Sequence, residues 1–244
     1  MKLKVVLIFI FSLVSSAAIA RPMITDLSER KIDINANFTG KQILLYGARV
    51  EAGQIVVVIR GPSGNFIVRR KERIAGMWIN TGSAKFYNIP QFYRIASSKN
   101  LKKLDADTLL KNLQIGMNTN DFAYKSKTNK HEIEAYKDAL LKKLEKDDLL
   151  DFEVINLPFL EGTLFRIYAY FPEKVLPGTY TAEIYSFNEG QLIGMQSIPI
   201  KVEKVGIEAS IYNFAHERPS LYGIFAILIA GGMGWLAARL FMKA

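Results

Sequence analysis

Short apolar or alternating runs, separated by turn-forming residues, fill most of the chain between its two apolar ends. The β-branched run at 55–59 is followed by the turn sequence GPSGN and a second run at 66–70, which predicts a β-hairpin. Residues 179–187 and 191–205 flank the turn sequence NEG and predict another pair of strands, with Pro199 at a sheet edge or a β-bulge. Several short strands of this kind predict a mainly β fold, an immunoglobulin-like β-sandwich.

The pattern changes to a helical one in the middle of the chain. Residues 101–115 and, more clearly, residues 130–150 place apolar side chains at helical spacing. The second helix carries four of them on one face: Ile133, Tyr136, Leu140 and Leu144. Because each flanking β-rich half is too short to close a sandwich alone, we predict a helical insertion at about 99–151 rather than a separate domain.

The two ends of the chain carry membrane signals. The N-terminal stretch has two lysines, an apolar core of signal-peptide length and an A-x-A cleavage site, which together predict a cleaved signal peptide rather than an uncleaved anchor. Near the C-terminus, twenty residues pass without a charge, enough for an α-helix to cross the hydrocarbon core of a bilayer. The predicted division is a signal peptide at 1–20, an exported β-sandwich domain at 21–215, a transmembrane helix at 219–238 and a cytoplasmic tail at 239–244.

This order of segments predicts a topology. A signal peptide carries the following domain across the membrane and the second apolar segment stops transfer, so we expect a single-pass protein of the inner (cytoplasmic) membrane with a periplasmic domain and a cytoplasmic C-terminus. Small residues recur every fourth position along the transmembrane segment, at Ala226, Ala230, Gly234 and Ala238. Such a stripe allows close packing against another helix, from a partner or a second copy, although glycine and alanine are common in membrane spans in any case.

Charge and cysteine content exclude several classes of function. The net charge is +9, but four basic residues lie in the terminal segments, and the 28 that remain against 23 acidic residues leave the domain only mildly basic. This balance does not call for a nucleic-acid partner. Cysteine is absent, which excludes disulfides, cysteine-based zinc sites and thiol catalysis, so the exported domain must be stabilised by its own core.

No motif in the sequence indicates catalysis, a metal or a cofactor. The two histidines, His131 and His216, lack ligand-like neighbours, and neither a GxSxG nor a Walker sequence occurs. Asp147, Asp148 and Asp151 cluster at a predicted helix end without the spacing of a calcium loop, so a solvated helix terminus explains them better. We therefore expect a protein that is not an enzyme and holds no cofactor.

The most unusual stretch is the aromatic segment at 74–98, preceded by the basic run RRKER. Aromatic and arginine side chains are enriched at binding hot spots but also fill sandwich cores, so both interpretations remain open. The candidate ligand or partner surface comprises Arg70, Trp78, Tyr93 and Arg94, of which we expect the last two to be exposed. The basic run could bind an anion or acidic lipid headgroups, or could be a charged strand edge that discourages aggregation.

Several stretches resemble the alphaproteobacterial putative transmembrane protein family. They are AGMWIN at 75–80, FYNIPQFY at 86–93, ASS at 96–98, FTG at 38–40 and LPGTYTAEIY at 176–185. The resemblance implies a membrane protein without assigned activity. It also implies a possible partner, because genes of this family often lie beside sulfite-exporter-type permeases.

Two functions are consistent with these features. The first is a non-enzymatic accessory or binding module that displays its domain outside the cytoplasm and docks, within the lipid bilayer, to an integral-membrane partner such as a permease or to a second copy. The alternative is a stand-alone periplasmic protein that binds a small ligand or anion through the aromatic segment.

Overall fold

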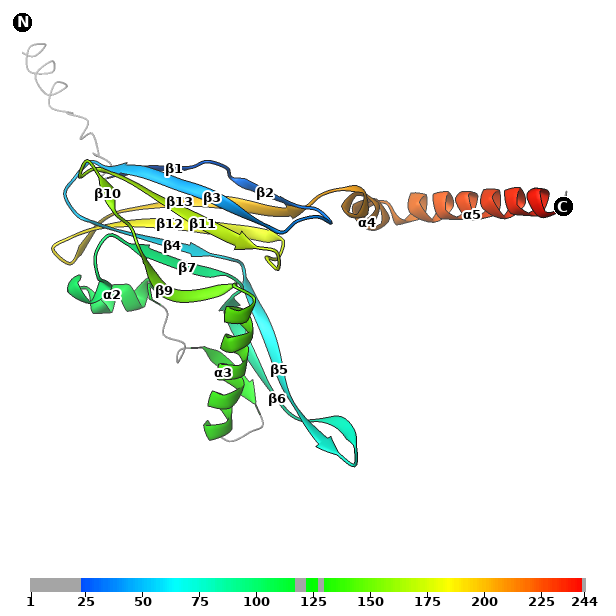
Figure 1. The fold of residues 1–244 in the computed structure, drawn as a ribbon, viewed down its shortest axis with the longest axis horizontal. Helices are drawn as coiled ribbons and strands as arrows, with labels where there is room; N and C mark the ends of the chain where they lie inside the picture. The colour runs from blue at the N-terminus through cyan, green and yellow to red at the C-terminus, as the bar shows by residue number, and fades with distance from the viewer. Residues whose placement is uncertain (1–22, 117–121, 127–129, 243–244) are drawn as a thin grey trace, which may run out of the picture.

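The protein folds into a β-sandwich with a projecting arm and a long C-terminal helix (Figure 1). The computed structural model describes residues 23–116, 122–126 and 130–242. The signal peptide predicted at 1–20 lies outside the described residues. The mainly β prediction, with one apolar C-terminal helix, is confirmed.

The first sheet of the sandwich is antiparallel throughout. Its strands, in spatial order, are β1 (Met23–Leu27), β3 (Gly40–Arg49), β11 (Leu164–Pro172) and β10 (Phe159–Leu160). Apolar residues alternate along β11, so that Phe165, Ile167 and Ala169 are buried while their neighbours face outward. One face of this sheet therefore supplies half of the core.

The second sheet supplies the other half. Its strands, in spatial order, are β2 (Lys31–Ile34), β13 (Gln191–Lys204), β12 (Gly178–Asn188), β4 (Gln54–Arg60), β7 (Tyr93–Ser97) and β9 (Leu150–Asn156). The central strand β4 is buried on both faces, which explains its unbroken β-branched sequence. The β12–β13 pair confirms the predicted NEG hairpin. Pro199 pairs only with β12, because β2 joins β13 from Lys201 onward, so Pro199 lies at an edge as predicted.

Aromatic rings join the two sheets in the core. Phe92, which precedes β7, stacks on Phe171 of β11 with ring centroids 4.9 Å apart, and Tyr180 of β12 meets both rings edge-on. All three side chains have no exposed surface. The Tyr180 hydroxyl donates to the carbonyl of Leu176, and burial raises the pKa of Tyr180 to about 12.

A third sheet forms the arm that projects from the sandwich in Figure 1. It comprises β5 (Ser63–Ile74), β6 (Met77–Pro90) and β8 (Ala123–Ser126), with β6 in the middle. The predicted hairpin between 55–59 and 66–70 is wrong, because β4 pairs with β7 and β12 while β5 pairs with β6. The GPSGN sequence is the point at which the chain leaves the sandwich for the arm.

Both stretches predicted as helical contain helices, and the described residues between them also contain a strand. The 3-10 helix η1 (Leu101–Lys103) and the short α2 (Asp107–Asn112) lie in the first predicted helix, and α3 (Lys130–Lys146) lies in the second. The four apolar residues predicted on one face of α3 are all buried. The strand between these helices, β8, was not predicted, and it ties the insertion to the arm.

Two helices end the chain. The span predicted at 219–238 is confirmed as α5 (Pro219–Phe241), which is long and apolar enough to cross a membrane. The shorter α4 (Ile207–Glu217), which precedes it, was not predicted. Phe214 of α4 contacts Tyr222 and Phe225 of α5 with ring centroids 6.1 Å apart, so the two helices pack against each other at the bend between them.

Candidate interaction surfaces

The tip of the β5–β6 arm carries exposed apolar side chains. Ala75 and Gly76 form a two-residue turn with φ angles of 50° and 84°, as a tight hairpin of type I′ requires. Trp78 is 70% exposed and Met77 is 65% exposed. Ile74 and Ile79 complete the tip and are also exposed. Four large apolar side chains at a hairpin turn are unusual, because such turns are ordinarily polar.

Helix α3 braces the arm close to this tip. Tyr136 is buried, and the guanidinium carbon of Arg70 lies over its ring, 6.0 Å from the ring centre. Arg70 also pairs with Glu72 at 3.1 Å and approaches Glu132 of α3 at 3.9 Å. Gly82 of β6 makes room for α3, since a Cβ at that position would collide with the Tyr136 hydroxyl. Arg70 is therefore partly exposed but engaged with carboxylates of its own chain.

The structure buries the other two candidate surface residues, so the expectation that Tyr93 and Arg94 are exposed is wrong. Tyr93 has no exposed surface, and Arg94 is 8% exposed. Arg94 donates from Nη2 to both the carbonyl oxygen and the carboxylate of Asp148, each at 2.6 Å, and from Nη1 to the carbonyl of Tyr93 at 3.1 Å. Its guanidinium carbon lies 5.0 Å from the centre of the Phe92 ring. These contacts make Arg94 a clamp between β7 and the turn that follows α3.

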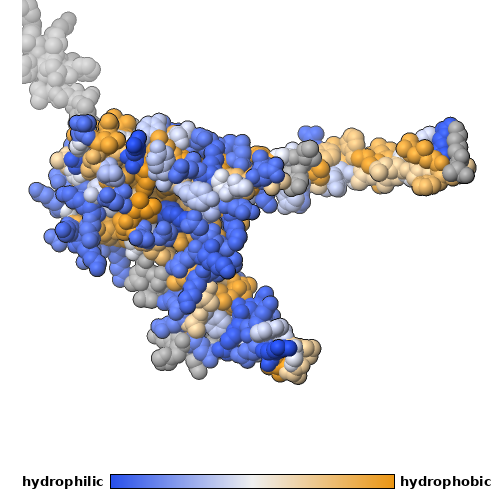
Figure 2. Space-filling model, viewed as in Figure 1, coloured by the Kyte–Doolittle hydropathy of each residue, from blue (hydrophilic) through white to orange (hydrophobic). Residues whose placement is uncertain are grey.

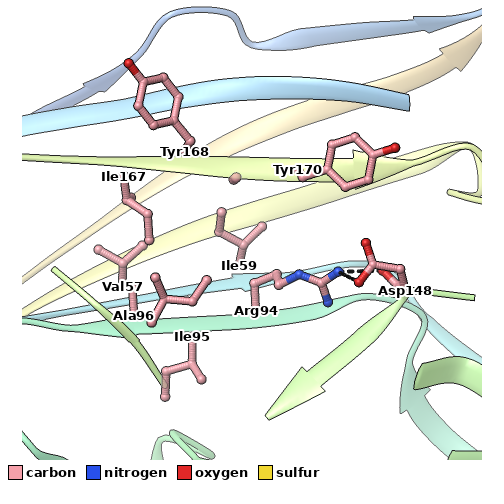
Figure 3. A pocket seen from close by; sticks show the side chains of 11 residues that line it. Val57, Ile59, Arg94, Ile95, Ala96, Asp148, Ile167, Tyr168 and Tyr170 are labelled. Atoms are coloured by element: carbon pink, nitrogen blue, oxygen red, sulfur yellow. Dashed lines mark hydrogen bonds and ion pairs between the residues drawn. The ribbon is translucent and has the colours of Figure 1, made fainter. Parts of the chain in front are cut away.

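A cavity of about 130 Å³ lies beside this clamp, between the two sheets (Figure 3). In Figure 3, Ile167 of β11 points across the gap toward Val57, whereas Tyr168 points away from it. The remaining lining is mostly apolar, with Ala96 and Ala169 too small to fill the space. Pockets for small molecules are ordinarily about 300–1,000 Å³, so this cavity is a packing defect rather than a ligand site.

A second ion pair, which is partly buried, holds the end of α2 against the second sheet. Arg60 of β4 forms an ion pair with Glu183 of β12 and donates to the carbonyls of Leu113 and Gln114 at 2.7 and 2.9 Å. Tyr185 donates to the same carboxylate at 2.8 Å, and burial raises the pKa of Tyr185. These contacts tie β4, β12 and the residues after α2 together, which gives the cluster a structural role.

Asp147 and Asp148, which follow α3, are paired with cations of the chain, whereas Asp151 accepts from the backbone N–H of Glu153. Asp147 accepts from Lys143 and Lys174, and these hydrogen bonds lower the pKa of Asp147. Asp148 is bound by Arg94. Within the described ranges, no group of three or more histidine, aspartate or glutamate side chains is placed to hold a metal ion.

Helix α5 extends away from the sandwich and contacts α4 near its start, and among the described residues none of its apolar stretch is buried. Figure 2 shows this helix as mostly hydrophobic along its length, beside a domain whose surface mixes hydrophilic and hydrophobic residues. Ala226, Ala230, Gly234 and Ala238 share one face of it, as residues four apart in a helix do. A Cβ at Gly234 would meet no atom within 4 Å, so none of the described residues lies against this position of the face.

The four candidates for a ligand surface are therefore not brought together. Arg70 and Trp78 lie on the arm, while Tyr93 and Arg94 lie in the sandwich. The sequence interpretation missed Ile74, Met77 and Ile79, which join Trp78 at the tip. The signal was the dipeptide Ala75-Gly76, which can form a hairpin turn and lies between Ile74 and the apolar run MWI at 77–79.

Comparison with known proteins identifies the family and nothing more specific. No curated protein matches the chain. The model of one family, described as "Putative transmembrane protein (Alph_Pro_TM)", matches residues 22–243. That match takes in the sandwich, the arm, the insertion and α5. Because it spans nearly the whole length, the chain belongs to this alphaproteobacterial transmembrane family.

Proposed function

We propose that the protein is a non-enzymatic accessory module that displays an immunoglobulin-like sandwich outside the cytoplasm and docks to an integral-membrane partner through α5. The observation that carries this proposal is the exposed apolar surface of α5, on which one face is lined by small residues. In a bilayer, helices associate by close packing, which small side chains permit.

The connection between the sandwich and α5 supports docking close to the membrane. Strand β13 ends at Lys204, and only Val205 and Gly206 separate it from α4. Helix α4 in turn contacts α5. A short connection of this kind keeps the sandwich near the membrane surface, where it can contact the extramembrane part of a partner.

The proposed orientation puts the sandwich in the periplasm and the C-terminus in the cytoplasm, with α5 in the inner membrane. The signal-like N-terminal sequence supports it, as does Arg239 at the far end of α5, whose guanidinium carbon lies 5.3 Å from the centre of the Trp235 ring. The family resemblance makes a sulfite-exporter-type permease the first partner to test.

A stand-alone ligand-binding function has less support. Its proposed side chains lie apart, and the cavity nearest Arg94 is too small for a metabolite. A larger hollow of about 920 Å³ is lined by the end of β13 and by Tyr212 and Asn213 of α4, the helix that leads into α5. That position suits contact with a membrane or a membrane protein better than capture of a free solute.

Two glycines on α5 provide a matched test. Gly234 lies on the small-residue face, and Gly232, two positions away, lies on the opposite side of the helix. A Cβ at either position meets nothing within 4 Å, so Gly234→Leu and Gly232→Leu leave the fold of the isolated chain unchanged. We expect crosslinking in native membranes, followed by detergent purification, to recover a discrete partner with the wild type and Gly232→Leu but not with Gly234→Leu. Recovery of the monomer alone from wild-type membranes would overturn the proposal.

A further inference from the structure

The tip of the β5–β6 arm has the composition of a membrane-contacting loop. Its last cross-strand pairs are Ile74 with Met77, Arg73 with Trp78 and Glu72 with Ile79. The apolar members of these pairs are all exposed. Figure 2 shows hydrophobic and strongly hydrophilic residues side by side at this end of the arm. A tryptophan beside arginine and isoleucine is the combination that favours the boundary between lipid headgroups and acyl chains.

The arm points toward the membrane side of the molecule. Helix α5 runs along the long axis of the molecule, so the bilayer surface lies across that axis where α5 begins (Figure 1). The arm leaves the sandwich sideways and slants in the same direction as α5, and its tip ends level with α4 along that axis. The tip therefore reaches the plane at which α5 enters the bilayer. It lies to one side of α5 within that plane.

The arm is stiff enough to hold the tip in that plane. β5 and β6 are paired from Ser63 with Pro90 to Ile74 with Met77, and α3 packs against both strands through Tyr136. The reach of the tip is thus set by a braced sheet and not by a mobile loop. The helical insertion therefore supports the arm, because α3 packs against both of its long strands.

The basic residues next to the tip favour a membrane surface that contains anionic lipid. Arg69, Lys71 and Arg73 accompany Arg70 on β5, and the single acidic residue among them, Glu72, pairs with Arg70. The arm therefore presents a net positive charge directly behind its apolar end. Anionic headgroups complement that charge, and each basic residue near such a surface strengthens binding about fivefold.

We propose that this tip inserts into the interfacial region of the same bilayer that α5 spans, at a surface containing anionic phospholipid, and thereby gives the sandwich a second membrane contact. The inference requires only that α5 crosses the membrane. It does not depend on the docking of α5 to a partner protein. A protein bound to the tip would be a different function, and the experiment separates the two.

The two tryptophans of the chain make the test direct, because one lies at the tip and the other in α5. In the full chain carrying Trp235→Phe, Trp78 is the sole tryptophan. The purified variant is reconstituted into vesicles of phosphatidylcholine and phosphatidylglycerol, with and without bromine on the acyl chains. Insertion predicts that brominated lipid quenches Trp78 emission and that aqueous iodide does not.

A control variant places the reporter elsewhere on the domain. Tyr168 lies on the outer face of the first sheet and is 51% exposed. With Tyr168→Trp, Trp78→Phe and Trp235→Phe combined, the emission is expected to respond to iodide and not to brominated lipid. This control shows that quenching at position 78 reports the tip and not general proximity to the vesicle.

Removal of charge tests the choice of lipid. Replacing Arg69, Lys71 and Arg73 with glutamine is expected to lower the ratio of inserted to free tip about fivefold per residue in anionic vesicles. Iodide quenching of Trp78 in the vesicles, with no effect of brominated lipid, would overturn the proposal. If Trp78 were then protected only in native membranes, a protein would be its partner instead.

Discussion

Arg94 is the residue for which the structure most changes the expected effect of a mutation. As a ligand-binding side chain it could be removed without loss of stability. As the clamp described above, it donates three hydrogen bonds while only 8% exposed. We therefore expect Arg94→Met, which keeps the apolar stem and removes the guanidinium, to destabilise the sandwich.

The magnitude follows from the partners of the guanidinium. A hydrogen bond to a charged group contributes about 1.5–3 kcal/mol, and the bonds to the carbonyls of Tyr93 and Asp148 are both lost. The Asp148 carboxylate adds little, because its side chain is 54% exposed and water screens it. A loss of about 3 kcal/mol is the resulting expectation for Arg94→Met.

The matched control is Asp148→Gly. Asp148 has a φ of 56°, a conformation that glycine adopts without strain, so this variant removes the carboxylate but keeps the backbone carbonyl that Arg94 binds. We expect a loss below about 1 kcal/mol for it. The assay is urea denaturation of the full chain in detergent micelles, followed by circular dichroism of the strands, with equal slopes required across variants. Losses of equal size in the two variants, or no loss in Arg94→Met, would refute the assignment of Arg94 as a clamp.

Three further predictions concern the core, the arm and the acid response. Phe92→Ala, which leaves a gap between the sheets, should lower the free energy of unfolding by about 3–5 kcal/mol in the same denaturation assay. Gly82→Ala should displace α3 from the arm and increase proteolysis there, and Tyr136→Phe, which removes the colliding hydroxyl, should partly restore protection. Asp147 has a lowered pKa in the folded state, so its stabilisation is complete above its unfolded pKa and is lost as the pH falls through the folded value. Asp147→Asn should therefore be less stable than the wild type at pH 6. The denaturation curves of the two proteins should approach each other as the pH is lowered.

Local patterns in the sequence predicted the elements whose partners are also local. The helix α3 follows from its apolar face, the β12–β13 hairpin from the turn between its strands, and α5 from its length without charge. In each case, the pattern that favours the element lies within the same short stretch of sequence as the element itself.

The remaining elements depend on contacts between distant parts of the chain. The β4 strand reads as half of a hairpin, yet its neighbours in the sheet, β7 and β12, come later in the chain and are not its nearest apolar run. Arg94 reads as exposed because arginine usually is, and only the tertiary fold supplies the carbonyls that bury it. The short α4 is not distinguishable from a linker until α5 is placed against it.

The parallel pairing of β2 with β13 has a consequence for the order of folding. Residues 31–34 hydrogen-bond with residues 201–204, so one of the earliest strands of the domain pairs with its last. Until that last strand has been synthesised, β2 has no partner, and the sheet to which it belongs retains an open edge. Because α4 and α5 follow directly, the ribosome delivers the closing strand and the apolar helix almost together. The second sheet therefore cannot be completed before synthesis has reached the residues that lead into α5.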